Sequence, residues 1–339
     1  MLAVTSNYLF WKQITFLREA LFIKKNKERW ENISQQPADN PDEMAFEFTQ
    51  LVDDLGYAKT FYPHSKVTRF LNTEASKRYL SIYRNRKEER NRLVRFFKYD
   101  VPLAVAKHHL ILLVCFILFT LFFFVGFFSS MKDEQFVREM LGDNYVNLSQ
   151  ENIQKGNPFG IYQQGNSFIV WLGIMINNIR VSFVYYLQGI IPFFWVLHSL
   201  INEGIRLGAF EYMFYAKGYG QLSVLTIMIH GTLELSALII SATAGVVLGT
   251  SWLFPGTLKR LDALKTGAKD GAKIIVGLIP VFMVAAFFEG FVTRYYRMPA
   301  WISILILASS LAFVIGYFVV YPIRLRKRIK TEMALLYAK

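Results

Sequence analysis

Apolar residues are concentrated in long runs along the last two-thirds of this chain. The clearest run, residues 110–128, contains no charged side chain, and a helix of about 19 residues is long enough to cross a ~30 Å hydrocarbon core. Further apolar stretches follow it. The pattern predicts six membrane-spanning helices, at residues 110–128, 168–187, 190–210, 222–247, 274–292 and 301–321.

Residues 1–107 follow a different pattern, in which apolar and charged positions alternate at helical spacing. This spacing is typical of amphipathic helices rather than strands. Residues 36–42 form a turn-rich break. Asn40, Pro41 and Asp42 within it predict the start of a second helix, because proline and acidic groups suit the first helical turn. One apolar series with this spacing is Phe46, Leu51, Leu55, Ala58 and Tyr62.

Composition and charge support a membrane protein and orient it. Hydrophobic residues make up 53% of the chain, which is too apolar for an ordinary soluble domain of this size. Six spans with an internal N-terminus place 30 of the 38 Lys and Arg in the cytoplasm, as the positive-inside rule requires. We therefore expect a multi-pass protein of the inner (cytoplasmic) membrane with both termini in the cytoplasm.

A five-span alternative merges the second and third stretches into one span at residues 181–201, because Asn177, Asn178 and Arg180 interrupt the second stretch. It would carry the basic loop at residues 250–273 and the basic tail across the membrane, so the charge pattern favours six spans. The predicted fold class is an all-α polytopic membrane protein with six transmembrane helices and an N-terminal cytoplasmic helical bundle. Its expected parts are a helical domain at 1–107, a membrane domain at 108–322 with an outer loop at 129–166, and a basic tail at 323–339.

Residues 77–98 contain nine Lys or Arg interleaved with aromatic residues. This pattern suits nucleic acid. It also suits a helix beside the membrane whose basic side chains contact anionic lipid head groups. The position just before the first span favours anionic lipids, and no nucleic-acid partner is expected. The single Cys115 lies inside an apolar run and excludes an intrachain disulfide or a cysteine-based zinc site.

Ionisable residues inside the spans are costly and usually mark buried contacts or pathways. His230 and Glu234 share one helix face at i, i+4 spacing. From depth along the spans we expect one buried cluster, with Arg180 as counter-charge to Glu234 or Glu289. The cluster has three interpretations: packing of the spans, an ion or proton path, or metal binding, for which the HExxH spacing is absent. No catalytic residue, cofactor or metal ligand set is predicted. The expected members are Asn177, Asn178, Arg180, Asn202, His230, Glu234 and Glu289.

Small residues recur at helical spacing in two of the spans and allow helices to approach closely. They predict a homodimer or larger homo-oligomer, although the same residues also suit packing within one chain. These residues are Gly204, Gly208, Ser241, Gly245 and Gly249.

Several separated motifs resemble one known family. They include DDLGYAKTFYP at 53–63, GDNYVNLSQENIQKGNPFGIY at 142–162, HGTLELSALIISATAGVVLG at 230–249 and AAFFEGFVT at 285–293. With these motifs the chain resembles the stage II sporulation protein M family, also known as the DUF95 family, over nearly its whole length.

The resemblance implies a non-enzymatic membrane scaffold that organises other membrane or envelope proteins. The partners implied are peptidoglycan-remodelling enzymes of the cell envelope or a MoxR-type ATPase system. The alternative function is a transporter or channel that uses the intramembrane polar cluster. The sequence alone does not decide between these two functions.

Overall fold

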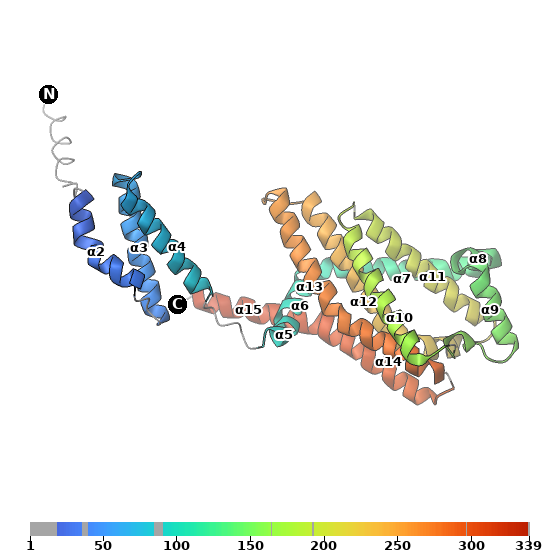
Figure 1. The fold of residues 1–339 in the computed structure, drawn as a ribbon. Helices are drawn as coiled ribbons and strands as arrows, with labels where there is room; N and C mark the ends of the chain where they lie inside the picture. The colour runs from blue at the N-terminus through green and yellow to red at the C-terminus, as the bar shows by residue number, and fades with distance from the viewer. Residues whose placement is uncertain are drawn as a thin grey trace, which may run out of the picture. The chain divides into compact units, whose positions relative to one another are not determined.

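A computed structural model describes residues 19–35, 40–84, 91–163, 165–191, 193–295 and 297–337. These residues form helices joined by short turns, with no strand among them, which confirms the all-α prediction. The chain divides into two compact units, Met1–Arg92 and Leu93–Lys339 (Figure 1).

The first unit contains α2 (Glu19–Gln35), α3 (Pro41–Phe61) and α4 (Lys66–Arg84). The predicted helix start is confirmed, since the Asn40 side chain caps α3 by accepting from the backbone N–H of Asp42 at 3.1 Å. Trp30 Nε1 donates to Asp54 Oδ2 at 2.7 Å, which ties α2 to α3. The three helices share a core of Phe22, Trp30, Ile33, Leu51, Ala58, Val67, Leu71 and Ala75.

The boundary between the units lies earlier than the predicted residue 107. Apart from Arg92, three short elements belong to the second unit: α5 (Arg92–Arg95), η2 (Phe96–Asp100) and α6 (Val101–Lys107). Val101, Ala104 and Val105 are buried in the core of that unit, so residues 93–107 are a packed part of the membrane unit. Part of the predicted basic juxtamembrane helix, residues 85–90, lies outside the described residues.

Each predicted apolar stretch falls on one long helix of the second unit. Five of these helices have the length and composition to cross a membrane, among the residues that the structure describes. The exception is α11, because His198, Glu203, Arg206 and Glu211 interrupt it, so the count of six spans rests on this helix and stays a prediction. The helices are α7 (His109–Lys132), α10 (Ser167–Gln188), α11 (Phe194–Ala216), α12 (Gly220–Leu253), α13 (Arg260–Phe287) with η4 (Phe288–Val292) and η5 (Thr293–Tyr295), and α14 (Ala300–Val314) with η6 (Ile315–Val320) and α15 (Tyr321–Tyr337).

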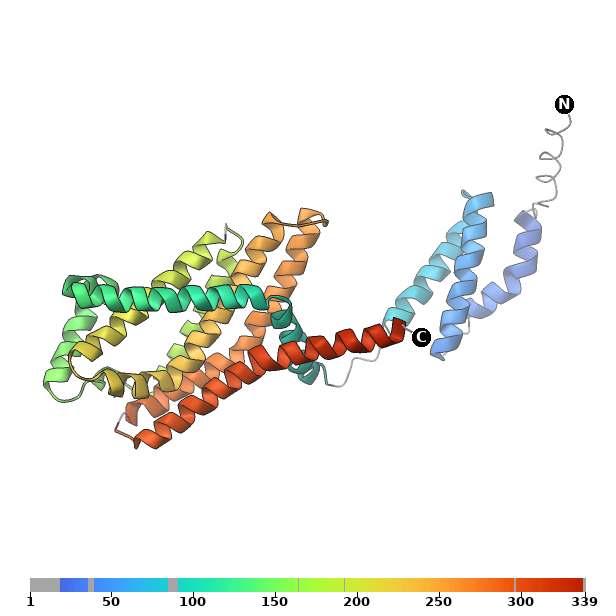
Figure 2. The same ribbon diagram turned by 180° about the vertical axis from the view of Figure 1, so that it is seen from behind.

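Helix α12 is the centre of the second unit. It is apolar on nearly all sides, and α7, α10, α11, α13 and α14 pack around it. Figure 2 shows α14, η6 and α15 running on as one continuous helix along the outside of this group. A buried side chain of α12 is therefore surrounded by protein, and this positions the polar residues described below.

The predicted small-residue stripes lie at contacts within the chain. A Cβ added at Gly245 would lie 2.2 Å from the Tyr185 carbonyl oxygen of α10, and one added at Gly208 would lie 2.1 Å from the Phe123 carbonyl oxygen of α7. Ser241 is hydrogen-bonded to Ser182 of α10 at 2.8 Å. The stripes thus bring α12 against α10 and α11 against α7, and they give no reason to expect a homodimer.

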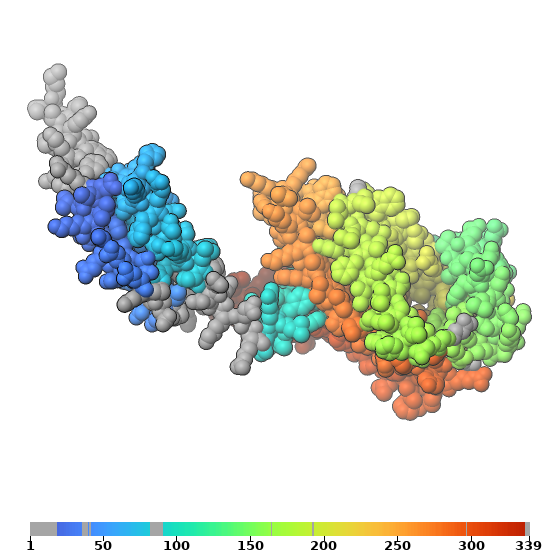
Figure 3. All heavy atoms as spheres, viewed as in Figure 1, coloured from blue at the N-terminus to red at the C-terminus, as the bar shows by residue number. Residues whose placement is uncertain are grey.

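Residues 133–163 of the predicted outer loop form a folded platform. It consists of α8 (Glu134–Leu141), α9 (Asp143–Gln154) and η3 (Gly160–Gln163), and it appears as a distinct lobe at one end of the second unit (Figure 3). Val146 and Phe159 of this α8–α9 platform share a core with Phe214 of α11 and Ile227 of α12. Arg294 of η5 also donates to the Tyr162 and Gly165 carbonyl oxygens, at 3.1 and 2.6 Å.

The helices alternate in direction, so α7 begins and η6 ends at the end of the unit opposite the platform. Cysteines introduced at Lys155 should therefore react with impermeant thiol reagents applied from outside the cell, whereas cysteines at Lys265 or Lys327 should not. Cys115 is buried and should give little background. Labelling at Lys265 from outside would contradict the six-span topology.

Candidate polar site among the membrane helices

Three ionisable side chains meet deep in the second unit. His230 and Glu234 project from α12, and Glu289 projects from η4. One ligand atom of each lies within 4.8 Å of those of the other two. His230 Nε2 is 4.0 Å from Glu289 Oε2, with only 6% of the histidine side chain and 19% of the glutamate side chain exposed.

Local helix geometry explains how these side chains meet. His230 and Glu234 are one turn apart, so both point from the same face of α12. Glu289 lies in η4, a π-helical segment that interrupts the α-helical geometry after α13. A π-helical turn changes the direction in which the following side chains point, and such turns recur at functional sites. It brings both Glu289 and Thr293 to His230.

Thr293 fixes the orientation of the His230 ring. The Thr293 hydroxyl donates to the Phe288 carbonyl oxygen at 3.2 Å, and its oxygen lies 2.9 Å from His230 Nδ1. Because the hydroxyl proton is engaged, Thr293 accepts the hydrogen from Nδ1. His230 Nε2 then carries a lone pair that is directed toward Glu289.

Asn178 of α10 borders the same site. It is 7% exposed and its amide faces the Glu234 carboxyl, but its Nδ2 has no partner at full hydrogen-bond geometry. A buried amide without a partner is costly in a folded protein. This amide can therefore form a hydrogen bond with a further group at the site.

The other expected members of the cluster lie elsewhere. The side chains of Asn177 and Arg180 are exposed, and Asn202 Nδ2 bonds to His198 Nε2 at 2.9 Å on α11. Arg180 forms no ion pair with Glu234 or Glu289 among the described residues, so the predicted pair is wrong. The reason is rotational, since Arg180 is two residues from Asn178 and so about 200° away around α10.

Tyr162 of the α8–α9 platform is a site residue that the sequence analysis missed. Its ring centroid lies 6.1 Å from that of His230. Burial raises the pKa of the Tyr162 hydroxyl well above its ordinary value, and the charges of Tyr145, Glu289 and Glu234 raise it further. Thr293 was also missed, although its position four residues after Glu289 placed it on the same side of the helix.

A cavity of about 500 Å³ lies between the platform and α11, and this tyrosine is part of its lining. Tyr145, Tyr162, Glu203 and Arg206 are among its lining residues. The Tyr162 ring therefore lies next to both the cavity and His230.

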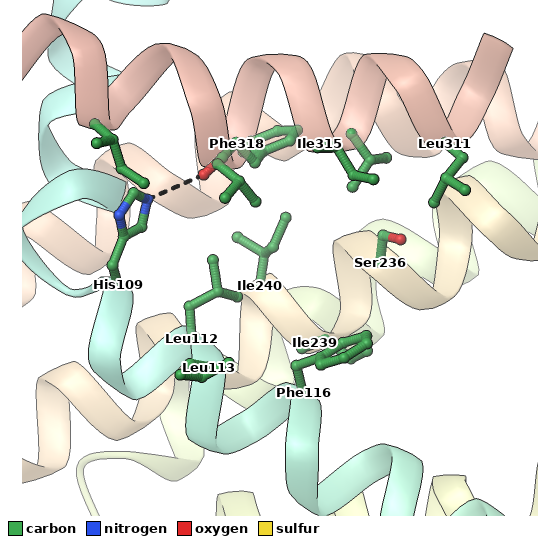
Figure 4. A pocket seen from close by; sticks show the side chains of 13 residues that line it. His109, Leu112, Leu113, Phe116, Ser236, Ile239, Ile240, Leu311, Ile315 and Phe318 are labelled. Atoms are coloured by element: carbon green, nitrogen blue, oxygen red, sulfur yellow. Dashed lines mark hydrogen bonds between the residues drawn. The ribbon is translucent and has the colours of Figure 1, made fainter. Parts of the chain in front are cut away.

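A second cavity, of about 420 Å³, is chemically different. It lies between α7, α12 and α14–η6, and its lining is apolar except for His109 and Ser236 (Figure 4). His109 Nε2 is hydrogen-bonded to the Phe318 carbonyl oxygen at 3.2 Å. Because Phe116 and Ile315 of the lining are about half exposed on the outside of the helices, a lipid acyl chain fits this groove better than a polar ligand.

Comparison with family models matches residues 115–294, more than half of the chain, to Stage II sporulation protein M. The chain belongs to this family. The match to the Stage II sporulation protein M family covers the polar site and the α8–α9 platform. Residues 20–84 match a separate domain of unknown function, DUF8413, which coincides with α2, α3 and α4. No curated protein and no solved structure matches the chain.

Proposed function

We propose that this protein is a non-catalytic scaffold of the inner membrane that holds partner proteins on both of its sides. The observation that carries the proposal is the α8–α9 platform, a folded surface docked on the ends of α11 and α12. A loop that only connected two spans would not require this shared core. A separately folded domain, Met1–Arg92, precedes the first of the chain's spans in sequence.

The exposed face of the platform suits a protein partner. Asn147, Leu148 and Glu151 of α9 are exposed, while Val146 and Ser149 are buried beneath them. Mixed polar and apolar contacts of this kind are common in non-obligate interfaces. The partner classes proposed are peptidoglycan-remodelling enzymes on the platform side and a MoxR-type ATPase system on the side of the first unit, with anionic lipids beside the spans.

Site-specific photocrosslinking in cells tests this role. A photoreactive amino acid at Asn147 or Glu151 should give adducts of defined mass with the same envelope protein, and a reciprocal probe on that protein should capture α9. The matched control is Phe124 of α7, which is 49% exposed on an apolar helix and should give no protein adduct. Identical patterns at Phe124 and Glu151 would contradict the scaffold.

The polar site favours transport of a cation or proton as a second candidate function. Buried His and Glu side chains are suitable groups for such a path. Toward the opposite end of α12, however, Ala237, Ile240 and Ala244 join a close-packed apolar core. Under transport, Glu234→Gln abolishes ion flux in proteoliposomes and leaves the platform crosslinks intact, whereas a scaffold shows no flux to abolish.

A further inference from the structure

We propose that His230, Glu234 and Glu289 bind one divalent transition-metal cation of the Zn²⁺ class, which enters from the platform side. This inference does not depend on the scaffold role. His230 and Glu234 lie on α12, whereas Glu289 lies on η4, more than fifty residues later in the sequence. The complete ligand set therefore has no local sequence motif.

The distances suit a metal ion after small side-chain movements. An ion at the centre of a triangle with 4.8 Å sides lies about 2.8 Å from each corner, whereas Zn–N and Zn–O bonds are ~2.0–2.2 Å. Each ligand atom must therefore move by less than about 1 Å, which a rotation of a glutamate side chain provides. The backbone can stay where it is.

The charges also favour a cation. Two carboxylates and the lone pair of His230 Nε2 face one another, and no Lys or Arg is ion-paired to Glu234 or Glu289 in the described part of the chain. Burying negative groups together without a partner is strongly unfavourable. A divalent cation at the centre neutralises both carboxylates and accepts the imidazole lone pair.

The surroundings already have the form of a metal site. Metal-binding histidines donate their other ring N–H to a neighbouring acceptor, which is the contact that Nδ1 makes with Thr293. Asn178 is the second observation, because its buried amide faces the Glu234 carboxyl and its Nδ2 has no partner at full hydrogen-bond geometry. The amide oxygen can supply a further ligand, or Nδ2 can donate to a coordinating carboxylate.

The ligand types select the class of metal. One imidazole and two carboxylates are typical of Zn²⁺ and related transition metals with four to six ligands. Ca²⁺ requires six to eight oxygen ligands, and Mg²⁺ prefers an octahedron of oxygens. The imidazole therefore argues against both of these ions.

Two buried hydroxyls lie on α12 between the site and the platform. Ser223 and Thr226 precede His230 on one face of α12 and are at most 1% exposed. The Ser223 hydroxyl faces the Glu211 carboxyl of α11, and the Thr226 hydroxyl has no partner. Buried hydroxyls of this kind are usually satisfied by water. Together with the cavity that Tyr162 lines, they favour entry from the platform side, whereas Ala237, Ile240 and Ala244 of α12 lie in an apolar core.

Metal content of the wild-type protein gives the first test. The full-length chain, purified without a polyhistidine tag and stripped with a chelator, should bind about one Zn²⁺ per chain after dialysis. X-ray absorption at the zinc edge should show one imidazole with oxygen ligands. Binding of less than a tenth of an equivalent at tens of micromolar zinc, or coordination without imidazole, would overturn the proposal whether or not any variant folds.

Variants assign the ligands. His230→Gln, Glu234→Gln and Glu289→Gln should each weaken zinc binding at least about 10-fold. Glu211→Gln is the matched control, because Glu211 is a buried carboxylate on α11 outside the cluster, and this variant should bind zinc as the wild type does. Wild-type affinity in all three cluster variants would place the zinc elsewhere and refute the assignment.

Sealed vesicles of known orientation test the route. Added EDTA does not cross the membrane and should remove zinc only when the α8–α9 platform faces the chelator. Equal rates of removal from both orientations would overturn entry from the platform side.

Discussion

Gly245→Leu should prevent the accumulation of folded protein. The first side-chain carbon would lie 2.2 Å from the Tyr185 carbonyl oxygen and 3.1 Å from the Tyr185 carbonyl carbon. A backbone oxygen cannot rotate away, so α10 and α12 must separate and lose the Ser182–Ser241 hydrogen bond as well. Overpacking of this kind costs at least ~3 kcal/mol.

Fluorescence-detected size exclusion of a tagged protein measures this effect as the loss of the monodisperse peak. Gly173→Leu is the control, because Gly173 lies in α10 and an added Cβ there meets nothing within 4 Å. Both substitutions remove a glycine from a membrane helix, so a difference between them reports the helix contact. Wild-type yield of Gly245→Leu would show that α10 and α12 do not approach as described.

Arg294→Ala should release the α8–α9 platform from the end of α13. The guanidinium group donates to the carbonyl oxygens of Tyr162, Gln163 and Gly165, and to the Ser167 hydroxyl. Hydrogen bonds from a charged group contribute about 1.5–3 kcal/mol each and are not additive. We expect a loss of about 2–4 kcal/mol in the free energy that docks residues 160–167.

Amide hydrogen exchange of residues 160–167 measures this docking directly. Exchange there should accelerate by at least about 10-fold in Arg294→Ala, because 1.4 kcal/mol corresponds to a factor of ten. Lys155→Ala is the control, since its ion pair with Glu151 is exposed to solvent and contributes little to stability. Unchanged exchange in Arg294→Ala would show that the apolar core alone holds the platform.

The sequence predicted the helices well because each has a strong local signal. The apolar runs are long enough to identify as helices without knowledge of packing. Asn40 and Pro41 mark a helix start because asparagine caps the first turn and proline suits its first position. The domain boundary at residue 107 was less accurate. In the sequence, Val101 and Val105 resemble the end of a soluble helix. Their burial depends on packing against α13, which the sequence does not reveal.

The candidate site was only partly predictable, because depth along a span says nothing about rotation around it. His230 and Glu234 share a face by spacing alone. Arg180 lies at a suitable depth but on the wrong side of α10, whose buried residues are Asn178, Ser182 and Tyr185. The π-helical turn that re-aims Glu289 and Thr293 leaves no recognisable signal in the residues themselves.

The all-round burial of α12 has a consequence for how the protein is made. Lipid cannot solvate His230 and Glu234. For an isolated helix that carries them, the free energy of membrane insertion is less favourable by ~2.5 kcal/mol or more per charge at the bilayer centre. Their partners Glu289 and Thr293 are translated more than fifty residues later. We expect the newly made α12 to stay beside the insertion machinery until α13 emerges, so that the two helices enter the bilayer as a pair.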